Sequence, residues 1–304
     1  MKKKPTIIHI AFGVLVSIIE SKTSRNSTKL PIRIGEYELI SKIHKNNSFN
    51  DYAIGVYRAN GEKYLIKTWT GAIKNYRYFD LISEYFLTSE LNNILSGSHI
   101  YSPKVFKLIE RKNSLSMVRE FIEGKTLSEF SLRKQVEVLS KTIIEFNSLN
   151  NKFNSFSADI PKRDYKFYLI CTLPLAVLTV ISHPKAFRVV TKAYLDFIKN
   201  IMEIKDRTLH LAHRDLSLDN IIINKKGIHI LDCGKIAFTY KNYDLSYISI
   251  NPKLRKVSDL VSARVNQSTN VLLRNFILLN QARSLGNPAN YNNFYIRRLY
   301  EEYK

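Results

Sequence analysis

Two short polar stretches hold the residues that are best suited to chemistry. The first runs from His213 to Asn220 and contains Asp215, and the second begins at Asp232, 17 residues after Asp215. Apolar segments flank both stretches, which places the polar groups between elements of a folded core. Carboxylate and amide oxygens can accept a proton or bind a hard cation such as Mg²⁺. The two stretches are therefore the first candidates for a reaction site.

The spacing of these residues resembles that of the protein-kinase-like superfamily. The first stretch matches the catalytic-loop pattern H-R-D-x-x-x-x-N, and Asp-Cys-Gly at 232–234 resembles D-F-G with cysteine in place of phenylalanine. The resemblance implies that Asp215 accepts the proton of a substrate hydroxyl. It also implies that Asn220 and Asp232 hold Mg²⁺ at the phosphates of ATP. Catalysis would then consist of positioning and charge neutralisation.

A second set of residues, earlier in the chain, would bind the nucleotide. Residues 64–67 (Tyr-Leu-Ile-Lys) resemble the V-A-I-K strand, whose lysine holds the α- and β-phosphates, so Lys67 is expected in that role. Glu84 is the expected ion-pair partner of Lys67, because it shares a helical face with the leucines that follow it. Glu90 is the competing candidate.

The stretch 116–124 resembles the hinge strand between kinase lobes. The resemblance implies that backbone groups of Glu120 and Ile122 meet the adenine. Arg119 departs from the pattern, because it stands where kinases usually place an apolar gatekeeper. The glycine-rich phosphate loop is also absent, since 41–50 reads SKIHKNNSFN. Backbone N–H groups of Asn and Ser turns can still cradle phosphates, and a chain without that cradle would be a pseudokinase.

The resemblance implies an α+β, two-lobed, protein-kinase-like fold, and the pattern of elements, a strand-rich first part followed by a helix-rich second part, agrees with it. Alternating segments, a hairpin turn at Asn60-Gly61 and one helix predict a small β-rich N-lobe over 35–122. Helical periodicity with one small hairpin predicts a larger helical C-lobe over 123–304, with a helical insertion at 125–205. Residues 1–34 are expected to form an apolar and basic extension and a linker. The helical tail is predicted to run from Leu254 to Gln281.

Several features separate the chain from typical Ser/Thr protein kinases. Ser217 stands where those enzymes usually have a lysine, and no Ala-Pro-Glu follows Asp232. Aminoglycoside and choline phosphotransferases insert helices in the same interval, and residues 243–247 look like their Asp-Leu-Ala element. Those enzymes usually have glycine where this chain has Arg214. Lipopolysaccharide-core kinases, which act on membrane-bound sugars, often keep the arginine.

The resemblance implies an ATP-dependent phosphotransferase that moves the γ-phosphate to a hydroxyl of a small molecule or a lipid-linked sugar. ATP and Mg²⁺ are the implied cofactors, and the acceptor is expected to be anionic or membrane-associated. Two alternatives stay open. One is a protein Ser/Thr kinase without an ordinary activation segment, and the other is a pseudokinase that serves as a binding module.

Composition limits the partners and the compartment. The 304 residues contain 47 Lys and Arg against 26 Asp and Glu, which gives a net charge of +21 and favours polyanionic partners. Two basic aromatic stretches, 74–78 and 291–300, are expected to be solvated helix faces, so nucleic acid is not favoured. The two cysteines have no metal-ligand spacing. These features predict the cytoplasm, with peripheral contact at the inner face of a membrane as a second expectation.

Two apolar runs are shorter than the ~20 residues that span a bilayer. Ile7 to Ile19 follows three lysines and is expected to be a packing extension, with a membrane-surface anchor and a cleaved signal as alternatives. Phe167 to Ile181 is predicted to be a buried helix. A membrane span at that run would put Lys67 and Asp215 on opposite sides of the membrane. The run is therefore expected to be buried in the C-lobe or to lie flat on a membrane surface.

Overall fold

The computed structural model describes residues 30–43, 52–71, 74, 76–149, 160–251, 254–282 and 289–303. The apolar run at 7–19 and most of the glycine-free loop, 44–50, lie outside these described residues. The chain divides into two compact units. The first unit consists of the chain up to Asn93 together with Ser102–Glu123. The second consists of Ile94–Tyr101 together with the chain from Gly124 onward. The division after Glu123 lies one residue from the boundary that the sequence predicts.

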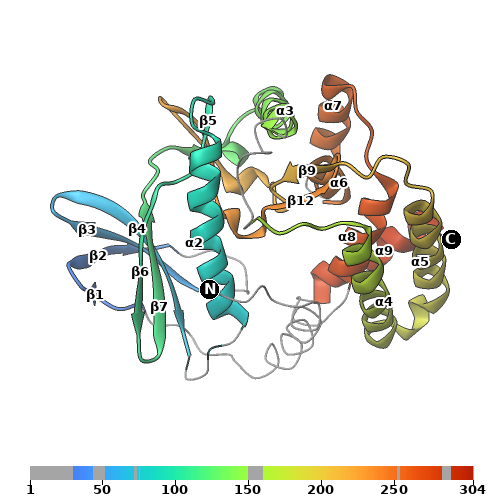
Figure 1. Ribbon diagram of the computed structural model, residues 1–304, viewed down its shortest axis with the longest axis horizontal. Helices are drawn as coiled ribbons and strands as arrows, with labels where there is room; N and C mark the ends of the chain where they lie inside the picture. The colour runs from blue at the N-terminus through green and yellow to red at the C-terminus, as the bar shows by residue number, and fades with distance from the viewer. Residues whose placement is uncertain are drawn as a thin grey trace. The chain divides into compact units, whose positions relative to one another are not determined.

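The first unit is an antiparallel sheet of six strands in the order β1-β2-β3-β4-β7-β6, with helix α2 (Tyr76–Ile94) packed on it (Figure 1). Its strands are β1 (Arg33–Ile34), β2 (Tyr37–Lys42), β3 (Ala53–Ala59), β4 (Glu62–Thr70), β6 (Val105–Arg111) and β7 (Ser114–Glu120). β1 lies in the stretch that the sequence assigned to the linker. It joins the sheet because Gly35, at φ 61°, turns the chain into β2.

Local sequence explains the centre of this sheet. Asn60 and Gly61 have φ values of 51° and 81°, as a two-residue type I′ turn requires between β3 and β4. On β4, Trp69 packs with Tyr78 and Leu81 of α2 in one buried cluster. Because residues three apart share a helix face, this packing also turns Glu84 toward the sheet.

The second unit is mostly helical and carries two small sheets. The helices are α3 (Leu132–Ser148), α4 (Tyr165–Ser182), α5 (Phe187–Met202), α6 (Tyr243–Ile250), α7 (Arg255–Val265), α8 (Val271–Ala282) and α9 (Ala289–Tyr303). One sheet has the order β5-β11-β10-β8 and the other pairs β12 with β9. The strands are β5 (Ile100–Tyr101), β8 (Lys125–Thr126), β9 (Leu209–Ala212), β10 (Ile221–Asn224), β11 (Gly227–Ile230) and β12 (Ala237–Tyr240).

Two buried clusters hold these helices. The larger one joins α4, α5, α8 and α9, which lie together in Figure 1, and includes Tyr168, Phe197 and Leu279. The smaller one joins α3, α6 and α7 and includes Leu139, Leu245 and Val261. β9 and α6 both contribute to the larger cluster as well, so the loop between β9 and β10 starts from a rigid base.

The predicted helical tail, 254–281, consists of two helices. The structure divides it into α7 and α8 at Asn266, which has φ 52°. Asn adopts this left-handed conformation more readily than most residues, and the N–H of Asn266 closes α7 on the Ala263 carbonyl. The apolar periodicity on either side concealed the break.

The prediction of a buried helix at 167–181 is only half correct. α4 packs one face, with Tyr168, Thr172 and Leu175, into the larger core. The opposite face exposes apolar side chains, at 50% for Leu173 and 68% for Ile181. In the described part of the chain, α4 is also the one helix whose length and composition would suffice to cross a membrane, and 28% of it is buried. Composition showed that α4 is apolar, but it did not show that, among the described residues, only one of its faces is buried.

Candidate active site

The first unit holds the nucleotide-binding candidates of the sequence. Nζ of Lys67, on β4, lies 2.6 Å from Oε2 of Glu84, on α2, and both residues are buried. Nη1 of Arg119 is 3.9 Å from the other oxygen of Glu84. A buried carboxylate needs such cationic partners. The partner of Lys67 is therefore Glu84 rather than Glu90, and Arg119, at the gatekeeper position, supports the same carboxylate.

The hinge candidates lie at the end of β7 and just beyond it. The N–H of Glu120 donates to the carbonyl of Lys104 at 2.8 Å, and the Glu120 carboxylate accepts the N–H of Lys104 at 3.1 Å. The N–H of Glu120 is therefore already bonded, and of its two backbone polar groups the carbonyl is the one that an adenine could meet. Ile122 is 8% exposed and lies outside β7. Their role toward adenine stays a prediction.

Asp215 lies in the second unit, on the loop that follows β9. Its two carboxylate oxygens have separate partners. The hydroxyl of Tyr247 donates to Oδ1 at 2.6 Å, and Nζ of Lys235 lies 2.7 Å from Oδ2. Burial opposes ionisation of this group, but Lys235 and the Tyr247 hydroxyl outweigh it and lower the pKa of Asp215. Asp215 is therefore an ionised, oriented carboxylate at neutral pH.

Asn220 is hydrogen-bonded to the backbone of Asp215, and its own backbone is hydrogen-bonded to the residue before Asp232. Nδ2 of Asn220 donates to the backbone carbonyl of Asp215 at 2.9 Å, and the N–H of Leu231 donates to the carbonyl of Asn220 at 2.8 Å. The loop is thereby tied to the start of the Asp-Cys-Gly turn. Asp232 has φ 54°, a left-handed conformation that Asp tolerates better than most residues.

The donor set fits Mg²⁺. With its amide nitrogen bonded inside the loop, Asn220 has its Oδ1 left for a metal, and Asp232 supplies a carboxylate. Mg²⁺ is commonly held by one or two protein oxygens together with phosphate oxygens and water. Among the described residues, no cluster of three His, Cys, Asp or Glu forms a cage that could bind a metal without a phosphate ligand.

Asp244, at the start of α6, fixes the backbone of the catalytic-loop candidate. Its oxygens accept the N–H of His213 at 2.9 Å and the N–H of Arg214 at 2.7 Å. Burial raises the pKa of Asp244, although both N–H groups oppose the rise.

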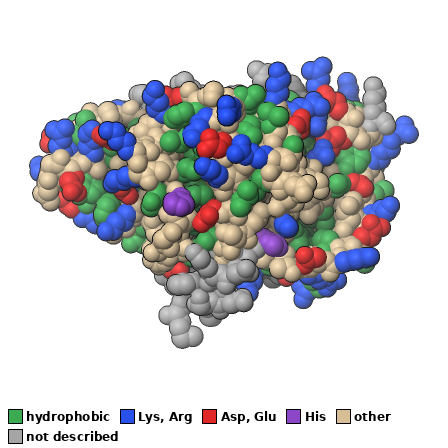
Figure 2. Space-filling model, turned by 90° about the horizontal axis from the view of Figure 1, so that it is seen from above, with side chains coloured by type: hydrophobic (Ala, Val, Ile, Leu, Met, Phe, Trp, Pro, Cys, Tyr) green, Lys and Arg blue, Asp and Glu red, His purple; other side chains and the backbone are tan. Residues whose placement is uncertain are grey.

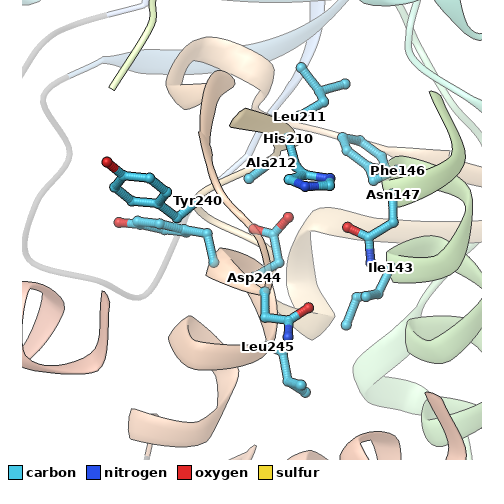
Figure 3. A pocket seen from close by; sticks show the side chains of 11 residues that line it. Ile143, Phe146, Asn147, His210, Leu211, Ala212, Tyr240, Asp244 and Leu245 are labelled. Atoms are coloured by element: carbon cyan, nitrogen blue, oxygen red, sulfur yellow. The ribbon is translucent and has the colours of Figure 1, made fainter. Parts of the chain in front are cut away.

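A cavity of about 10 Å³ beside Asp244 is lined by Phe146, Ala212 and other residues of α3, β9 and α6 (Figure 3). That volume holds one water at most, so the acceptor does not bind there.

Three residues of this site escaped the sequence-based prediction of site residues: Lys235, Tyr247 and Asp244. Lys235 directly follows the Asp-Cys-Gly turn, and the other two belong to the Tyr-Asp-Leu-Ser-Tyr element at 243–247. Their proximity to the 213–220 stretch in sequence was visible, but the direction of each side chain was not. Only the folded arrangement brings Lys235 and Tyr247 to the same carboxylate.

No family model matches the sequence, and no curated protein matches it. Solved structures do match the fold. The apo form of a thermostable mutant of aminoglycoside phosphotransferase APH(4)-Ia has a TM-score of 0.66 at 12% identity, covering 87% of this chain and 94% of its own. The streptomycin–ATP complex of APH(2″)-IIa has a TM-score of 0.56 at 14% identity, covering 99% and 97%. The chain therefore has the α+β, two-lobed, protein-kinase-like fold of the aminoglycoside phosphotransferases, and the fold prediction is confirmed.

Proposed function

We propose that this chain is an ATP-dependent phosphotransferase that moves the γ-phosphate of Mg·ATP to a hydroxyl group. The observation that carries the proposal is the setting of Asp215, an ionised carboxylate held at 2.6 and 2.7 Å by Tyr247 and Lys235. Structures of the same fold include complexes with ADP, AMP-PNP and ATP. A carboxylate oriented in this way, with two metal-ligand candidates beside it, suits phosphoryl transfer.

Each residue has a distinct task in this proposal. Asp215 orients the acceptor hydroxyl and takes its proton. Lys67, fixed by Glu84, holds the α- and β-phosphates. Asn220 and Asp232 would hold Mg²⁺, which when bound neutralises charge on the phosphates.

Lys235 supplies a cation that the sequence pattern lacks. Ser217 stands where Ser/Thr kinases usually carry a lysine, and Lys235 reaches the same carboxylate from the Asp-Cys-Gly turn. Its side chain is 63% exposed, so it can turn toward a phosphate that enters the site. We therefore assign to Lys235 the task of stabilising the negative charge that develops on the transferred phosphoryl group.

The acceptor belongs to the hydroxyl-bearing small molecules or lipid-linked sugars. Similar structures hold hygromycin B, spectinomycin or streptomycin, all of which carry hydroxyl groups. The net charge of +21 supports an anionic acceptor here. The exposed apolar face of α4 supports an acceptor presented at a membrane. A location in the cytoplasm or at the inner face of a membrane is part of the same proposal.

The test is transfer of labelled γ-phosphate from Mg·ATP into a fractionated cell extract. Asp215→Ala and Asp232→Ala serve as parallel variants, and Asp259→Asn, an exposed carboxylate on α7, is the matched control. Label in the lipid or small-molecule fraction with the control, and none with the two variants, is the expected result. Label in protein alone would identify a protein kinase instead. ATP binding without any Asp215-dependent label would identify a pseudokinase.

A further inference from the structure

Arg163 and Arg214 flank the same small sheet in the second unit. The N–H of Arg163 donates to the carbonyl of Phe238 on β12 at 2.7 Å, and Lys162 forms a parallel bridge with Phe238. β12 pairs with β9, whose last residue, Ala212, is two residues before Arg214. Arg214 directly precedes Asp215 in the chain. The two arginines therefore enter from the two sides of β12, beside the catalytic-loop candidate.

The two guanidinium groups pack against aromatic rings, and neither forms an ion pair within the described residues, although the Asp244 carboxylate attracts Arg214 from a greater distance. Arg163 stacks 4.0 Å from the centre of the Phe167 ring, and Arg214 lies 5.2 Å from the centre of the Tyr243 ring. Nη1 of Arg214 donates to the Lys235 carbonyl at 3.2 Å. The Nε of each arginine is buried without a hydrogen-bond partner. Within the described residues, neither guanidinium has a carboxylate within 4.0 Å.

Bringing two such cations together is unfavourable without an anion between or beside them. Burial, together with the charge of Arg214, lowers the pKa of Arg163 to about 10. Exposed arginines elsewhere would not experience this cost. Lys and Arg side chains are spread over the visible face of the molecule in Figure 2, so a general positive field does not require this half-buried pair.

The backbone of Arg214 points to the same conclusion. Its φ of 67° lies in the left-handed region, which favours glycine and is unfavourable for a long side chain. Asp244 holds it there by accepting its N–H. Strain of this kind at a residue beside a reactive group is a reason to look for a task of the side chain.

We propose that Arg163 and Arg214 form a subsite for an anionic group, a phosphate or a carboxylate, carried by the acceptor whose hydroxyl meets Asp215. The inference rests on the proposed function and narrows its substrate class to acidic hydroxyl compounds. The planar fork of each guanidinium matches the oxygens of such a group, and the unpaired Nε atoms would gain acceptors. Lys235 contacts both places. Its carbonyl accepts a hydrogen bond from Nη1 of Arg214, and its Nζ lies beside Oδ2 of Asp215.

The experiment is calorimetric titration of the full chain, at constant ionic strength, with inorganic phosphate, glucose 6-phosphate and glucose. The wild type is compared with Arg163→Gln and Arg214→Gly, the latter of which also relieves the backbone strain. We expect each variant to bind phosphate roughly tenfold more weakly or worse, because charge-assisted bonds to phosphate are among the stronger hydrogen bonds. Glucose 6-phosphate should bind more tightly than inorganic phosphate, and glucose should not show dependence on either arginine.

Two controls locate the site. Arg188→Gln removes an exposed arginine of α5, and Lys67→Met removes the cation of the nucleotide half of the protein. Retained phosphate binding in both supports the subsite. Unchanged binding in the two arginine variants, an equal loss in Arg188→Gln, or loss only in Lys67→Met would overturn it. Exclusion of glucose 6-phosphate while inorganic phosphate binds would overturn the acceptor role.

Further measurements distinguish a loss of the subsite from a failure to fold and from a failure of the proposed function. Thermal melting by circular dichroism monitors each variant, and Arg163→Lys, which keeps the charge without the fork, replaces Arg163→Gln if that variant does not fold. Arg163→Lys should bind phosphate with an intermediate affinity. Arginine-dependent phosphate binding without γ-phosphate transfer would contradict the proposed function and leave the subsite intact. Transfer without arginine-dependent binding would contradict the subsite alone.

Discussion

The carboxylate of Asp215 ionises in a setting that would by itself discourage ionisation. Its side chain is 23% exposed, and burial favours the neutral acid. Lys235 and Tyr247 reverse this effect, so the pKa of Asp215 is below its ordinary value in the folded protein. A lowered carboxylate pKa stabilises the fold above the unfolded pKa of ~3.9, and this contribution is lost as the pH falls through the folded value. At neutral pH the group is both ionised and stabilising.

Removing the amine of Lys235 should therefore shift the acid side of the pH–rate profile. In Lys235→Met, burial is no longer offset by a cation, so the pKa of Asp215 rises and the acid limb of kcat/KM moves to higher pH. The measurement is kcat/KM for transfer between pH 4.5 and 8. Lys225→Met, at an exposed turn of the second unit, is the control and should keep the wild-type limb. An unchanged limb in Lys235→Met would show that Lys235 does not tune Asp215.

The Lys67–Glu84 pair should contribute to stability as well as to nucleotide binding. Both side chains are at most 10% exposed, and Glu84→Gln would leave Lys67 buried without its anion. Breaking a buried pair in this way costs about 3 kcal/mol or more. Urea unfolding should show that loss, and the KM for ATP should rise. Glu90→Gln should change stability by about 0.5 kcal/mol or less. The opposite order of the two variants would contradict the assignment of Glu84.

At the scale of elements, α4 packs one face into the larger core and leaves the other exposed among the described residues. Leu175 is 4% exposed in the larger core, while Val177 and Ile181 are 48% and 68% exposed. Leu175→Ala should cost about 2–5 kcal/mol. Val177→Gln and Ile181→Gln should each change the free energy of unfolding by about 0.5 kcal/mol or less. Urea denaturation of the three variants is the test, and a large loss in either glutamine variant would show that the exposed face packs on another part of the chain.

The sequence was most informative where a function depends on neighbouring residues. Asp215 and Asn220 share one loop, so their relation could be predicted from spacing, and the Lys67 strand could be predicted from its hairpin turn. Contacts made by side chains across elements could not be predicted, because the direction of a side chain depends on tertiary packing. Lys235 and Tyr247 reach Asp215 only through η5 (Cys233–Lys235) and α6.

Two details that the predicted elements did not contain have the same origin. The division of the tail at Asn266 depends on one left-handed residue, and apolar periodicity on both sides of it continued without a visible stop. The composition of α4 resembled that of a buried helix, but burial depends on which neighbours a helix finds. The hydrophobic pattern of a sequence indicates that a helix face can be buried. Whether it is buried depends on the elements that pack beside it in the fold.

At the scale of the whole molecule, the net charge of +21 should act on every anionic ligand. The KM for Mg·ATP should rise several-fold between about 20 mM and 300 mM salt, because salt at the upper value shortens the Debye length to less than ~10 Å. The inhibition constant of adenosine, which is uncharged, should stay constant over the same range. Steady-state kinetics with adenosine as competitor measures both quantities. A parallel rise for adenosine would indicate a change of the protein rather than screening.

The stretch from Asp232 to α6 has a consequence for control of the proposed activity. β12 lies in the middle of it and pairs with β9 along the full length of β12, and Thr239 and Tyr240 are 0% and 4% exposed. The structure describes this stretch throughout, and its central strand is held in a sheet, which leaves no long loose segment in it that a modification could order or release. Flux through the reaction would then follow the copy number of the protein and the supply of its acceptor, as in a metabolic step that is set by synthesis rather than by a signal.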